Sequence, residues 1–346
     1  MKYIPLLRVN TLLPFVTFLH RIGSPTEKLL EEVKLPLFAL DHPESLIPRH
    51  QAFSLIEKAA HREGIDNLGL LVGKATSIAD LGTFGRIICQ SLTVYDAFNT
   101  VKNMINANNS GEIFWIKEQE KTAYFCQRYL HNHEVNCHYA AQFASRLMIE
   151  LVSIALGKLW QPPTIYLQGE RGCDLKDESL SITKIRAGMG FTAIVFPRSF
   201  LSLPLKFPVA LDNKPSQKDR ENLYSSSPVQ NISGSLKQVI TPLLPNGYPD
   251  INLAKEITGM SVRTLQRRLG EEGLTYTQVV EKIRFEQAVL WLQEPQIKLI
   301  DIAMELGYSD PAHFTRAFKR WTGLSPRDFR RQKLANYQSD TPHFKM

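Results

Sequence analysis

Arginine, glutamine and threonine side chains gather in two segments of the C-terminal third of the chain, at spacings that place them along helices. Leu265 and Leu269 in the first segment, and Phe314 and Phe318 in the second, make the apolar stripe of each helix, so the polar residues face elsewhere. An arginine can donate two hydrogen bonds to guanine, and a glutamine can pair with adenine. These rows therefore suit the reading of base edges in DNA. The candidate base-reading residues are Arg263, Thr264, Gln266, Arg267, His313, Thr315 and Arg316.

A second set of basic side chains lies beside these rows. Between residues 316 and 333 the chain carries seven basic residues against Asp328 alone. Contacts to phosphate fix the register of a protein on a duplex without reading its sequence. The candidate phosphate-binding residues are Arg268, Lys319, Arg320, Arg327, Arg330 and Arg331.

Each row follows a short apolar helix and a glycine, which is the pattern of a helix-turn-helix unit. Gly259 stands where the chain must leave the first short helix, and glycine takes φ > 0 there at little cost. Ser261 is then expected to cap the next helix. In the second unit Gly307 has the same place, followed by Asp310 as a cap and by Pro311, which the first helical turn tolerates. The alternative is a helical bundle whose arginines form only a solvated face.

Residues 277–294 lie between the two units and contain no glycine or proline. Apolar residues recur in this segment at helical spacing, which predicts one connecting helix of about 18 residues, roughly 27 Å long. Such a helix would hold the two recognition helices at a nearly fixed separation.

These residues carry a resemblance to a known family. The motif Arg284-x3-Ala288-x3-Leu292, then Ile302-Ala303-x2-Leu306-Gly307-Tyr308, and later Gly323-x-Ser325-Pro326, is similar to the DNA-binding domain of the AraC/XylS family of bacterial transcription regulators over residues 233–333. The resemblance implies an all-α domain with two helix-turn-helix motifs joined by a long helix. Pro311 and Ala312 stand where relatives often carry polar base-readers, so the second helix is expected to read less sequence than the first.

The first 211 residues mix helical and strand-like segments, which predicts an α+β domain. Helices are expected within residues 6–35, with a break at 23–26, and at 54–62, from 77 onward and at 139–159. Strands are expected at 112–116 and 122–126, as a hairpin, and at 164–167 and 192–196.

This region also resembles a known module, the N-terminal effector domain of the arabinose-binding-domain-like branch of the same family. The resemblance spans residues 6–210 and rests on the segments 67–73, 80–85 and 91–97, which read NLGLLVG, DLGTFG and SLTVYDA. It lacks the double-histidine signature of a metal-binding sugar cupin, so it does not imply a bound sugar. It implies a small-molecule effector such as a fatty acid or an amino acid. An apolar pocket would favour the first, and paired charges inside it the second.

Residues 212–232 are rich in Ser, Pro, Lys and Asn, and such a composition buries too little apolar area to offset the entropy of ordering. The sequence therefore predicts an effector-binding or dimerisation domain at 1–211, a flexible linker at 212–232 and the DNA-binding domain at 233–346.

Catalytic and cofactor motifs are absent from the sequence. It contains no G-x-S-x-G, H-E-x-x-H or P-loop, and Gly188-Met189-Gly190 is interpreted as a turn. We expect neither an enzyme nor a cofactor. His131, His133, Cys137 and His138 are metal-ligand types at short spacing, but no second pair accompanies them, which favours a polar loop.

The composition limits the compartment and the partners. The net charge of +7 over 346 residues suits an anionic partner. Four scattered cysteines are typical of free thiols in a reducing cytosol, and the apolar run at 9–19 is too short to span a membrane.

We therefore expect a cytoplasmic bacterial transcription regulator that binds double-stranded promoter DNA and a small-molecule effector, and no membrane. RNA polymerase and a second copy of the chain are further candidate partners. Two alternatives stay open: an effector-independent regulator whose N-terminal domain only self-associates, and an architectural DNA binder. The sequence does not determine the effector, the promoters, the oligomeric state or the sign of regulation.

Overall fold

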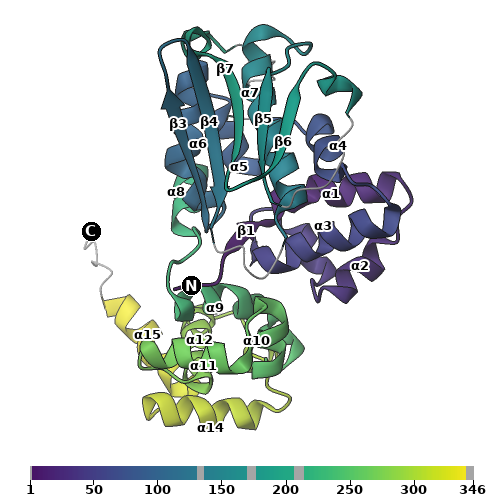
Figure 1. Ribbon diagram of the computed structural model, residues 1–346. Helices are drawn as coiled ribbons and strands as arrows, with labels where there is room; N and C mark the ends of the chain where they lie inside the picture. Colours follow the sequence, from purple (N-terminus) through teal and green to yellow (C-terminus); the bar gives the residue numbers. More distant parts are fainter. Residues whose placement is uncertain (1, 131–135, 170–176, 206–213, 340–346) are drawn as a thin grey trace, which may run out of the picture. The chain divides into compact units, whose positions relative to one another are not determined.

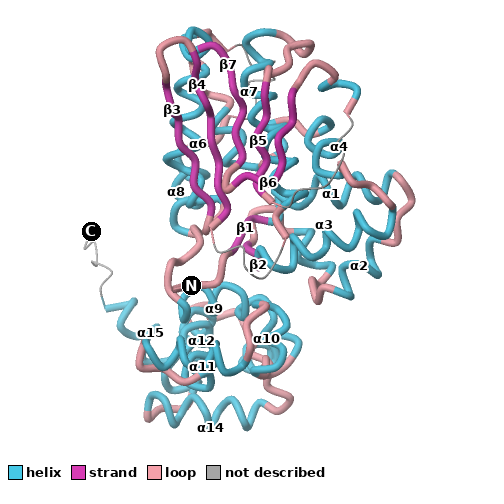
Figure 2. The backbone as a smooth tube through the Cα atoms, in the orientation of Figure 1, coloured by secondary structure: helices cyan, strands magenta, loops and turns pink. Residues whose placement is uncertain are grey.

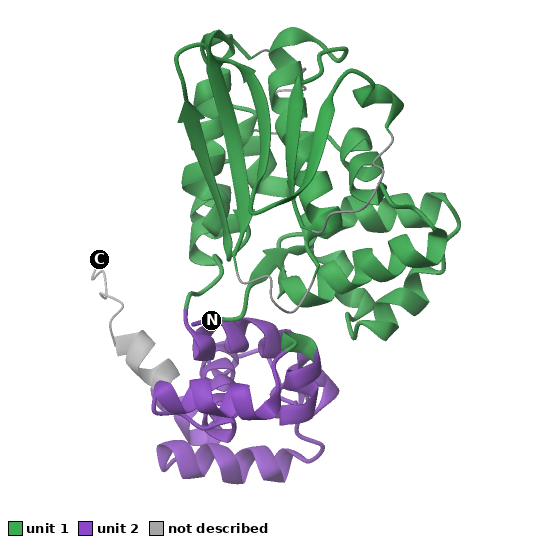
Figure 3. Cartoon of the chain, viewed as in Figure 1, with its two compact units in different colours: residues 1, 3–230, 257–259 green, residues 2, 231–256, 260–346 purple. Residues whose placement is uncertain are grey.

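The computed structural model describes residues 2–130, 136–169, 177–205 and 214–339, with side chains up to residue 332. The chain forms two compact units (Figure 3). One consists mainly of residues 3–230 and the other mainly of residues 231–346.

A five-stranded sheet forms one layer of the first unit, in the order β3-β4-β7-β5-β6 (Figure 1). Neighbouring strands run antiparallel except β5 and β6, which are parallel. The strands are β3 (Glu112–Glu118), β4 (Thr122–Tyr129), β5 (Thr164–Gln168), β6 (Lys184–Met189) and β7 (Thr192–Pro197). A separate antiparallel pair joins β1 (Leu6–Arg8) to β2 (Leu46–Pro48).

Helices α6 (Val94–Asn108) and α7 (His138–Leu156) pack against the same sheet (Figure 2). The core lies between these helices and the sheet. There the ring of Phe98 on α6 stacks on the ring of Phe125 on β4, with centroids 3.8 Å apart. Further helices of this unit are α1 (Val9–Arg21), α2 (Thr26–Glu32), α3 (Arg49–Glu63), α4 (Leu68–Ala75), α5 (Gly82–Ile88) and α8 (Gln217–Ser225). Short 3-10 helices occur at Leu37–Asp41, Ile78–Asp80, Glu178–Leu180 and Arg198–Ser202.

The α+β prediction is confirmed, including the hairpin of β3 and β4. Two local predictions are wrong. Residues 6–8 form a strand rather than part of a helix, because they pair with β2, forty residues further along the chain. Of the turn expected at 188–190, Gly188 and Met189 lie in β6, and only Gly190 lies in the bend before β7. Strand β6 lies at the edge of the sheet and, in the described part of the chain, pairs with β5 alone. Its alternation of polar and apolar residues is short, so the sequence pattern that would predict a strand is weak.

Helix α7 is long and apolar enough to cross a membrane by composition, but 67% of its apolar window is buried inside the protein. Its burial against the sheet and α4 identifies it as a core helix.

The segment expected to be a flexible linker contains α8, which packs against α5 and α6. Ser216 and Asp219 form a capping box at its start. Leu223 is 2% exposed and belongs to the core of the first unit. The capping box and the buried side chain of Leu223 stabilise a helix here, although the average composition of the segment indicated a flexible linker. Residues 212 and 213 lie outside the described part of the chain.

The second unit is all-helical. It contains α9 (Ile232–Ile240), a 3-10 helix (Thr241–Asn246), α10 (Ile251–Thr258), α11 (Val262–Glu271), α12 (Tyr276–Leu292), α13 (Leu299–Glu305), α14 (Pro311–Thr322) and α15 (Pro326–Ser339). The connecting helix expected at 277–294 is α12, with 17 residues, and it lies between two helix-turn-helix pairs as predicted.

Candidate DNA interface and effector pocket

The first helix-turn-helix pair is α10 and α11, and its turn has the expected local chemistry. Gly259 has φ +68°, in the left-handed region that favours glycine. The hydroxyl of Ser261 accepts a hydrogen bond from the backbone N–H of Thr264 at 3.2 Å, which caps α11. Leu265 and Leu269 are fully buried. The opposite face of α11 is thereby fixed toward solvent.

The candidate base-readers of α11 differ in their surroundings. The side chains of Arg263 and Gln266 are exposed and make no hydrogen bond or ion pair with any described residue. Arg267 is exposed and forms an i,i+4 ion pair with Glu271. Thr264 is half-buried, and its hydroxyl lies 2.9 Å from that of Ser261. Arg263 and Gln266 are therefore the most available, and Arg267 must first leave Glu271.

The second pair, α13 and α14, repeats this arrangement. Gly307 has φ +74°. The carboxylate of Asp310 accepts from the backbone N–H of Ala312 at 2.8 Å and caps α14, with Pro311 in its first turn. The three candidate base-readers of this helix are exposed, and the Thr315 hydroxyl donates back to the Pro311 carbonyl at 3.0 Å. The exposed residues are His313, Thr315 and Arg316.

The candidate phosphate-binding residues fall into two groups. Lys319, Arg320, Arg327 and Arg331 are exposed. Of these, Arg320 forms an ion pair with Glu281 at 2.7 Å and Arg331 one with Asp328 at 3.0 Å.

Arg268 and Arg330 are half-buried instead. A guanidinium nitrogen of Arg268 lies 3.5 Å from the sulfur of Met260. Arg330 donates from Nε to the Leu292 carbonyl at 3.3 Å, and burial lowers the pKa of its guanidinium. These two arginines hold parts of the fold together in this state.

Arg284 has a role that local sequence reasoning did not assign. It lies on α12, is 7% exposed and donates from Nη2 to the carbonyl of Gly307 at 3.0 Å. Its guanidinium carbon lies over the rings of Tyr308 and Tyr248, 4.4 and 5.0 Å from their centroids. Arg284 therefore ties the connecting helix to the turn of the second pair. Its place in the motif Arg284-x3-Ala288-x3-Leu292 was the available signal.

Gly307 is constrained by its neighbours as well as by its φ angle. A Cβ there would lie 2.3 Å from the Leu244 carbonyl and 2.6 Å from that of Gly247. The turn therefore packs directly on the segment that follows α9, and any larger residue would push it away.

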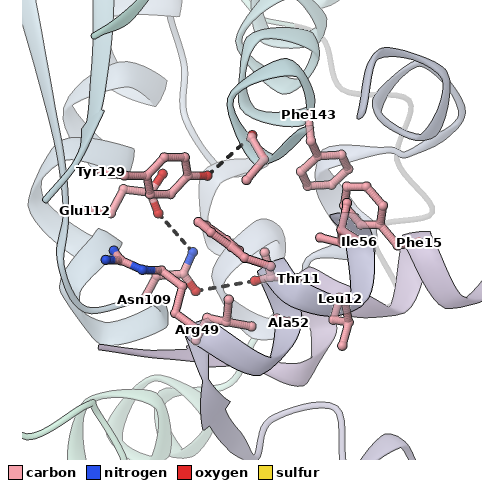
Figure 4. A pocket seen from close by; sticks show the side chains of 13 residues that line it. Thr11, Leu12, Phe15, Arg49, Ala52, Ile56, Asn109, Glu112, Tyr129 and Phe143 are labelled. Carbon is pink, nitrogen blue, oxygen red and sulfur yellow. Dashed lines mark hydrogen bonds between the residues drawn. The ribbon is translucent and has the colours of Figure 1, made fainter. Parts of the chain in front are cut away.

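The first unit contains a pocket between α1, α3, α7 and the start of β3 (Figure 4). The empty space at this site, open solvent included, is about 380 Å³, and within it the side chains leave room for little more than a water molecule. The larger apolar lining residues are Leu7, Leu12, Phe15, Phe53, Ile56 and Phe143. The polar ones are Thr11, Arg49, Asn109, Glu112 and Tyr129.

Two opposite charges lie at the polar side of this pocket. Arg49 donates to the carbonyls of Gly111 at 2.6 Å and Leu130 at 2.5 Å. Its guanidinium lies 5.7 Å from the rings of Phe53 and Tyr129. Burial lowers the pKa of the Arg49 guanidinium, and the nearby Glu112 charge acts in the opposite direction.

Glu112 is 4% exposed. Its two oxygens accept hydrogen bonds from Asn109 Nδ2 at 3.1 Å and Gln127 Nε2 at 2.9 Å. Burial raises the pKa of the Glu112 carboxyl, and these two hydrogen bonds and the Arg49 charge oppose that rise. The pocket therefore combines an apolar lining with one buried carboxyl group and one buried guanidinium group.

The hypothesis of a metal site falls largely on residues that are not described, because 131–135 lie outside the described part. Cys137 and His138 are described and buried. Burial raises the pKa of the Cys137 thiol to about 11, and His138 Nε2 lies 2.8 Å from the Gln142 amide nitrogen.

Two family models match this chain and define its class. The N-terminal arabinose-binding domain of AraC transcription regulators matches residues 23–205, and a helix-turn-helix domain matches residues 254–332. A chain with this α+β unit and two helix-turn-helix pairs is a bacterial-type transcription regulator in class, rather than an enzyme. The protein belongs to the AraC family of transcription regulators.

Individual relatives match over shorter stretches. The ornithine utilization regulator of Pseudomonas aeruginosa is 36% identical over 143 residues, which cover 39% of this chain and 42% of that protein. The regulator VqsM of the same organism is 42% identical over 100 residues, 28% of this chain and 31% of VqsM. The matches thus span less than half of either relative. The crystal structure of CdpR from Pseudomonas aeruginosa is similar with a TM-score of 0.37 and 20% identity, covering 89% of this chain and 96% of that one.

Proposed function

We propose that this protein is a cytoplasmic, sequence-specific DNA-binding regulator that responds to a small-molecule effector. The observation that carries the proposal is the pair of capped helices α11 and α14, each with a buried apolar stripe and an exposed row of base-reading side chains. DNA binding is assigned to residues 233–346 and effector binding to residues 1–211.

In this proposal α11 reads more sequence than α14. The side chains of Arg263 and Gln266, in the first half of α11, have no partner in the described part of the chain. Helix α14 begins instead with Pro311 and Ala312, which cannot pair with bases through polar side chains. Thr315 and Arg316 are the main candidates on α14. The site is therefore expected to have one well-specified half and one weakly specified half.

Helix α12, with 17 residues, is roughly 26 Å long. Two readers enter the major groove on one face of B-DNA when they are about one turn apart, ~34 Å or 10–10.5 base pairs. The length of α12 plus the breadth of the flanking units fits this spacing, so one chain should cover two successive groove segments.

The test is quantitative binding to a site selected from random DNA, followed by footprinting. We expect protection of two segments one turn apart. Insertion of about five base pairs between them should reduce affinity to that of one unit, because it rotates one segment to the opposite face. Equal affinity for selected and random DNA would instead identify an architectural binder.

For the effector, the pocket of the first unit is the proposed site. Its apolar lining would suit the chain of a fatty acid. The carboxylate of a fatty acid, however, would face the carboxyl group of Glu112 as well as the guanidinium of Arg49. An amino acid with an apolar side chain offers an ammonium to Glu112 and a carboxylate to Arg49. The similarity to an ornithine utilization regulator is consistent with an amino acid.

The effector test uses matched probes on the full chain. L-phenylalanine, hydrocinnamate and phenethylamine share one body and differ in their charged groups, so only the first should raise the melting temperature. Glu112→Gln should remove that shift while the fold persists. A shift with long-chain fatty acids instead would reverse the assignment. If no probe shifts the protein and it dimerises fully, a self-association role for this unit replaces effector binding.

Two partners of this regulator are also proposed, a second copy of the chain and RNA polymerase. Dimerisation through the first unit would raise the effective concentration of the second reader on DNA. Sedimentation of the full chain, with and without its DNA site, tests the dimer. Co-retention of purified polymerase on the same site tests the other contact.

A further inference from the structure

Arg8 is a buried charge whose contacts join three distant segments of the first unit. It is 1% exposed, although it is an arginine. Its Nε and Nη2 donate to the carbonyl of Ala107 at 3.1 and 3.0 Å, and its Nη1 donates to the carbonyl of Glu44 at 2.5 Å. Its Nη2 also reaches the Leu223 carbonyl at 2.8 Å and the Ser226 hydroxyl at 3.1 Å.

Ala107 lies at the end of α6, Glu44 lies just before β2, and Leu223 and Ser226 lie at the end of α8. The charge of Arg8 has one close counter-ion, the carboxylate of Glu44 at 3.6 Å. Desolvation by burial lowers the pKa of the Arg8 guanidinium, and Glu44 opposes that change. A buried cation held mainly by carbonyls is stable only while all of its partners stay in place.

Helix α8 is held to the first unit by a small set of contacts, which include this clamp and a hydrogen bond from Arg220 to Gln90. It is a polar helix of nine residues, and Leu223 is its one buried residue. Its end is therefore held by Leu223 and by the hydrogen bonds of Arg8. Six residues after Ser225 the chain reaches residue 231, where the second unit begins. Helix α8 is therefore the last described helix before the DNA-binding unit.

Two of the segments that meet at Arg8 also line the pocket. They are the segment around Arg8 itself and the end of α6. Leu7 and Thr11, on either side of Arg8, are lining residues, as is Asn109, two residues after Ala107. The amide of Asn108 donates to the Thr11 hydroxyl at 3.2 Å and to Asn109 Oδ1 at 3.1 Å. Asn109 in turn donates to Glu112. A continuous set of hydrogen bonds therefore leads from the pocket acid to the start of α1.

The pocket is narrow in this state, with room for little more than a water molecule. Any larger occupant must move its walls, and these walls include β1 and the end of α6. A shift of either segment changes the distances from Arg8 to Ala107 and to the end of α8.

We propose that Arg8 is a positioning residue that transmits occupancy of the pocket to α8, and so to the tether of the DNA-binding unit. The proposal rests on the function proposed above for the pocket. In the structure Arg8 joins the end of α8 to the end of α6. A filled pocket displaces β1 or the end of α6, weakens the bonds to Leu223 and Ser226, and releases the end of α8.

The experiment is a double-mutant cycle on the full chain, and it needs no knowledge of the effector. Ala52→Met places extra atoms in the pocket as a fixed occupant, because Ala52 lines it and is 1% exposed. Arg8→Lys keeps the charge and loses the fork that reaches several carbonyls. Amide hydrogen exchange of residues 217–226 is the readout, with exchange of β4 and β7 as the report on the fold.

We expect Ala52→Met alone to speed exchange of residues 217–226 by about tenfold, the effect of one lost hydrogen bond to a charged group. Arg8→Lys alone should speed it by a similar or larger factor. The added effect of Ala52→Met should then vanish in the Arg8→Lys background, because the connection is already broken. Exchange in β4 and β7 should stay unchanged.

Ser226→Ala is the milder variant, should Arg8→Lys fail to fold, because it removes one acceptor on α8 and leaves the buried guanidinium in place. It should speed exchange of 217–226 and reduce the effect of Ala52→Met. Arg62→Lys, an exposed arginine on α3, is the matched control and should change nothing.

If Ala52→Met has the same effect with and without Arg8, or has none on α8, Arg8 does not transmit occupancy. Failure of the proposed function would give a different result. The double-mutant cycle would still give the expected exchange rates, but no small molecule would alter DNA binding.

Discussion

The buried arginines of the first unit and the exposed arginines of the second unit have different roles. In the first unit, Arg8 and Arg49 are buried and donate mainly to backbone carbonyls, and Arg146 is buried against Asp177 at 2.8 Å. In the second unit most arginines are exposed, and Arg263 and Arg316 have no hydrogen bond or ion pair with any described residue. The difference teaches that burial rather than residue type separates an arginine that holds a fold together from one that waits for an anionic partner.

The largest expected effect is on the buried side of this comparison. Arg49→Leu removes the hydrogen bonds to Gly111 and Leu130 and leaves the buried Glu112 without its opposing charge. We expect a loss of about 3–5 kcal/mol in the stability of the first unit. Denaturant unfolding followed by amide hydrogen exchange of β4 and β7, two strands of the first unit, measures it. Arg62→Leu, at an exposed site, should change stability by less than about 0.5 kcal/mol, and equal losses for the two variants would refute the distinction.

Arg284 is the exception in the second unit, because it is buried there, and it sharpens the comparison. Arg284→Leu removes the bond to Gly307 and the contacts with Tyr248 and Tyr308. We expect a cost of about 3 kcal/mol, seen as faster hydrogen exchange in α13 and α14. DNA affinity should fall mainly through the half-site that α14 reads. Unaltered protection of that half-site in a footprint would mean that the turn holds without Arg284.

Burial also predicts a pH dependence that is confined to the first unit. Glu150 on α7 accepts a hydrogen bond from the Ile78 N–H at 3.2 Å, and desolvation raises the pKa of its carboxyl to about 7. The folded state therefore binds this proton more tightly than the unfolded state does. The contribution of Glu150 to stability should be fully present below the unfolded pKa near 4.5 and should be lost as pH rises to about 7.

Glu150→Gln is expected to remove this dependence and to raise stability at pH 8 by roughly 3 kcal/mol. Melting temperatures of both proteins between pH 5 and 8 provide the measurement. Parallel curves for the two proteins across that range would show that Glu150 is not the titrating group.

The smallest effects are expected among the exposed arginines, and they divide base-readers from phosphate-binders. Arg267→Ala should cost roughly 1–3 kcal/mol on the selected site and relax the preference at one base pair. Arg320→Ala should weaken binding to all sequences alike and lower the salt slope by about one. If both variants weakened selected and random DNA equally, Arg267 would not be a base-reader.

The sequence by itself determined the two helix-turn-helix pairs and the helix between them. The reason is that each signal is local. Gly259 and Gly307 take positive φ within their own turns. Ser261 and Asp310 cap their helices by accepting hydrogen bonds from backbone N–H groups only two or three residues further along the chain. The exposed rows on α11 and α14 follow from helical periodicity alone. The β3–β4 hairpin was predictable for the same reason.

Only the tertiary structure decided the roles of Arg8, Arg49 and Arg284, and the order within α8. Arg8 meets a partner 215 residues away at Leu223, and Arg49 meets Leu130 across 81 residues. No pattern within a helix or strand encodes such pairs, because they exist only once the sheet and its helices have come together. Composition indicated a linker at α8 because it averages over residues, whereas a single buried Leu223 and one distant guanidinium hold that helix in place.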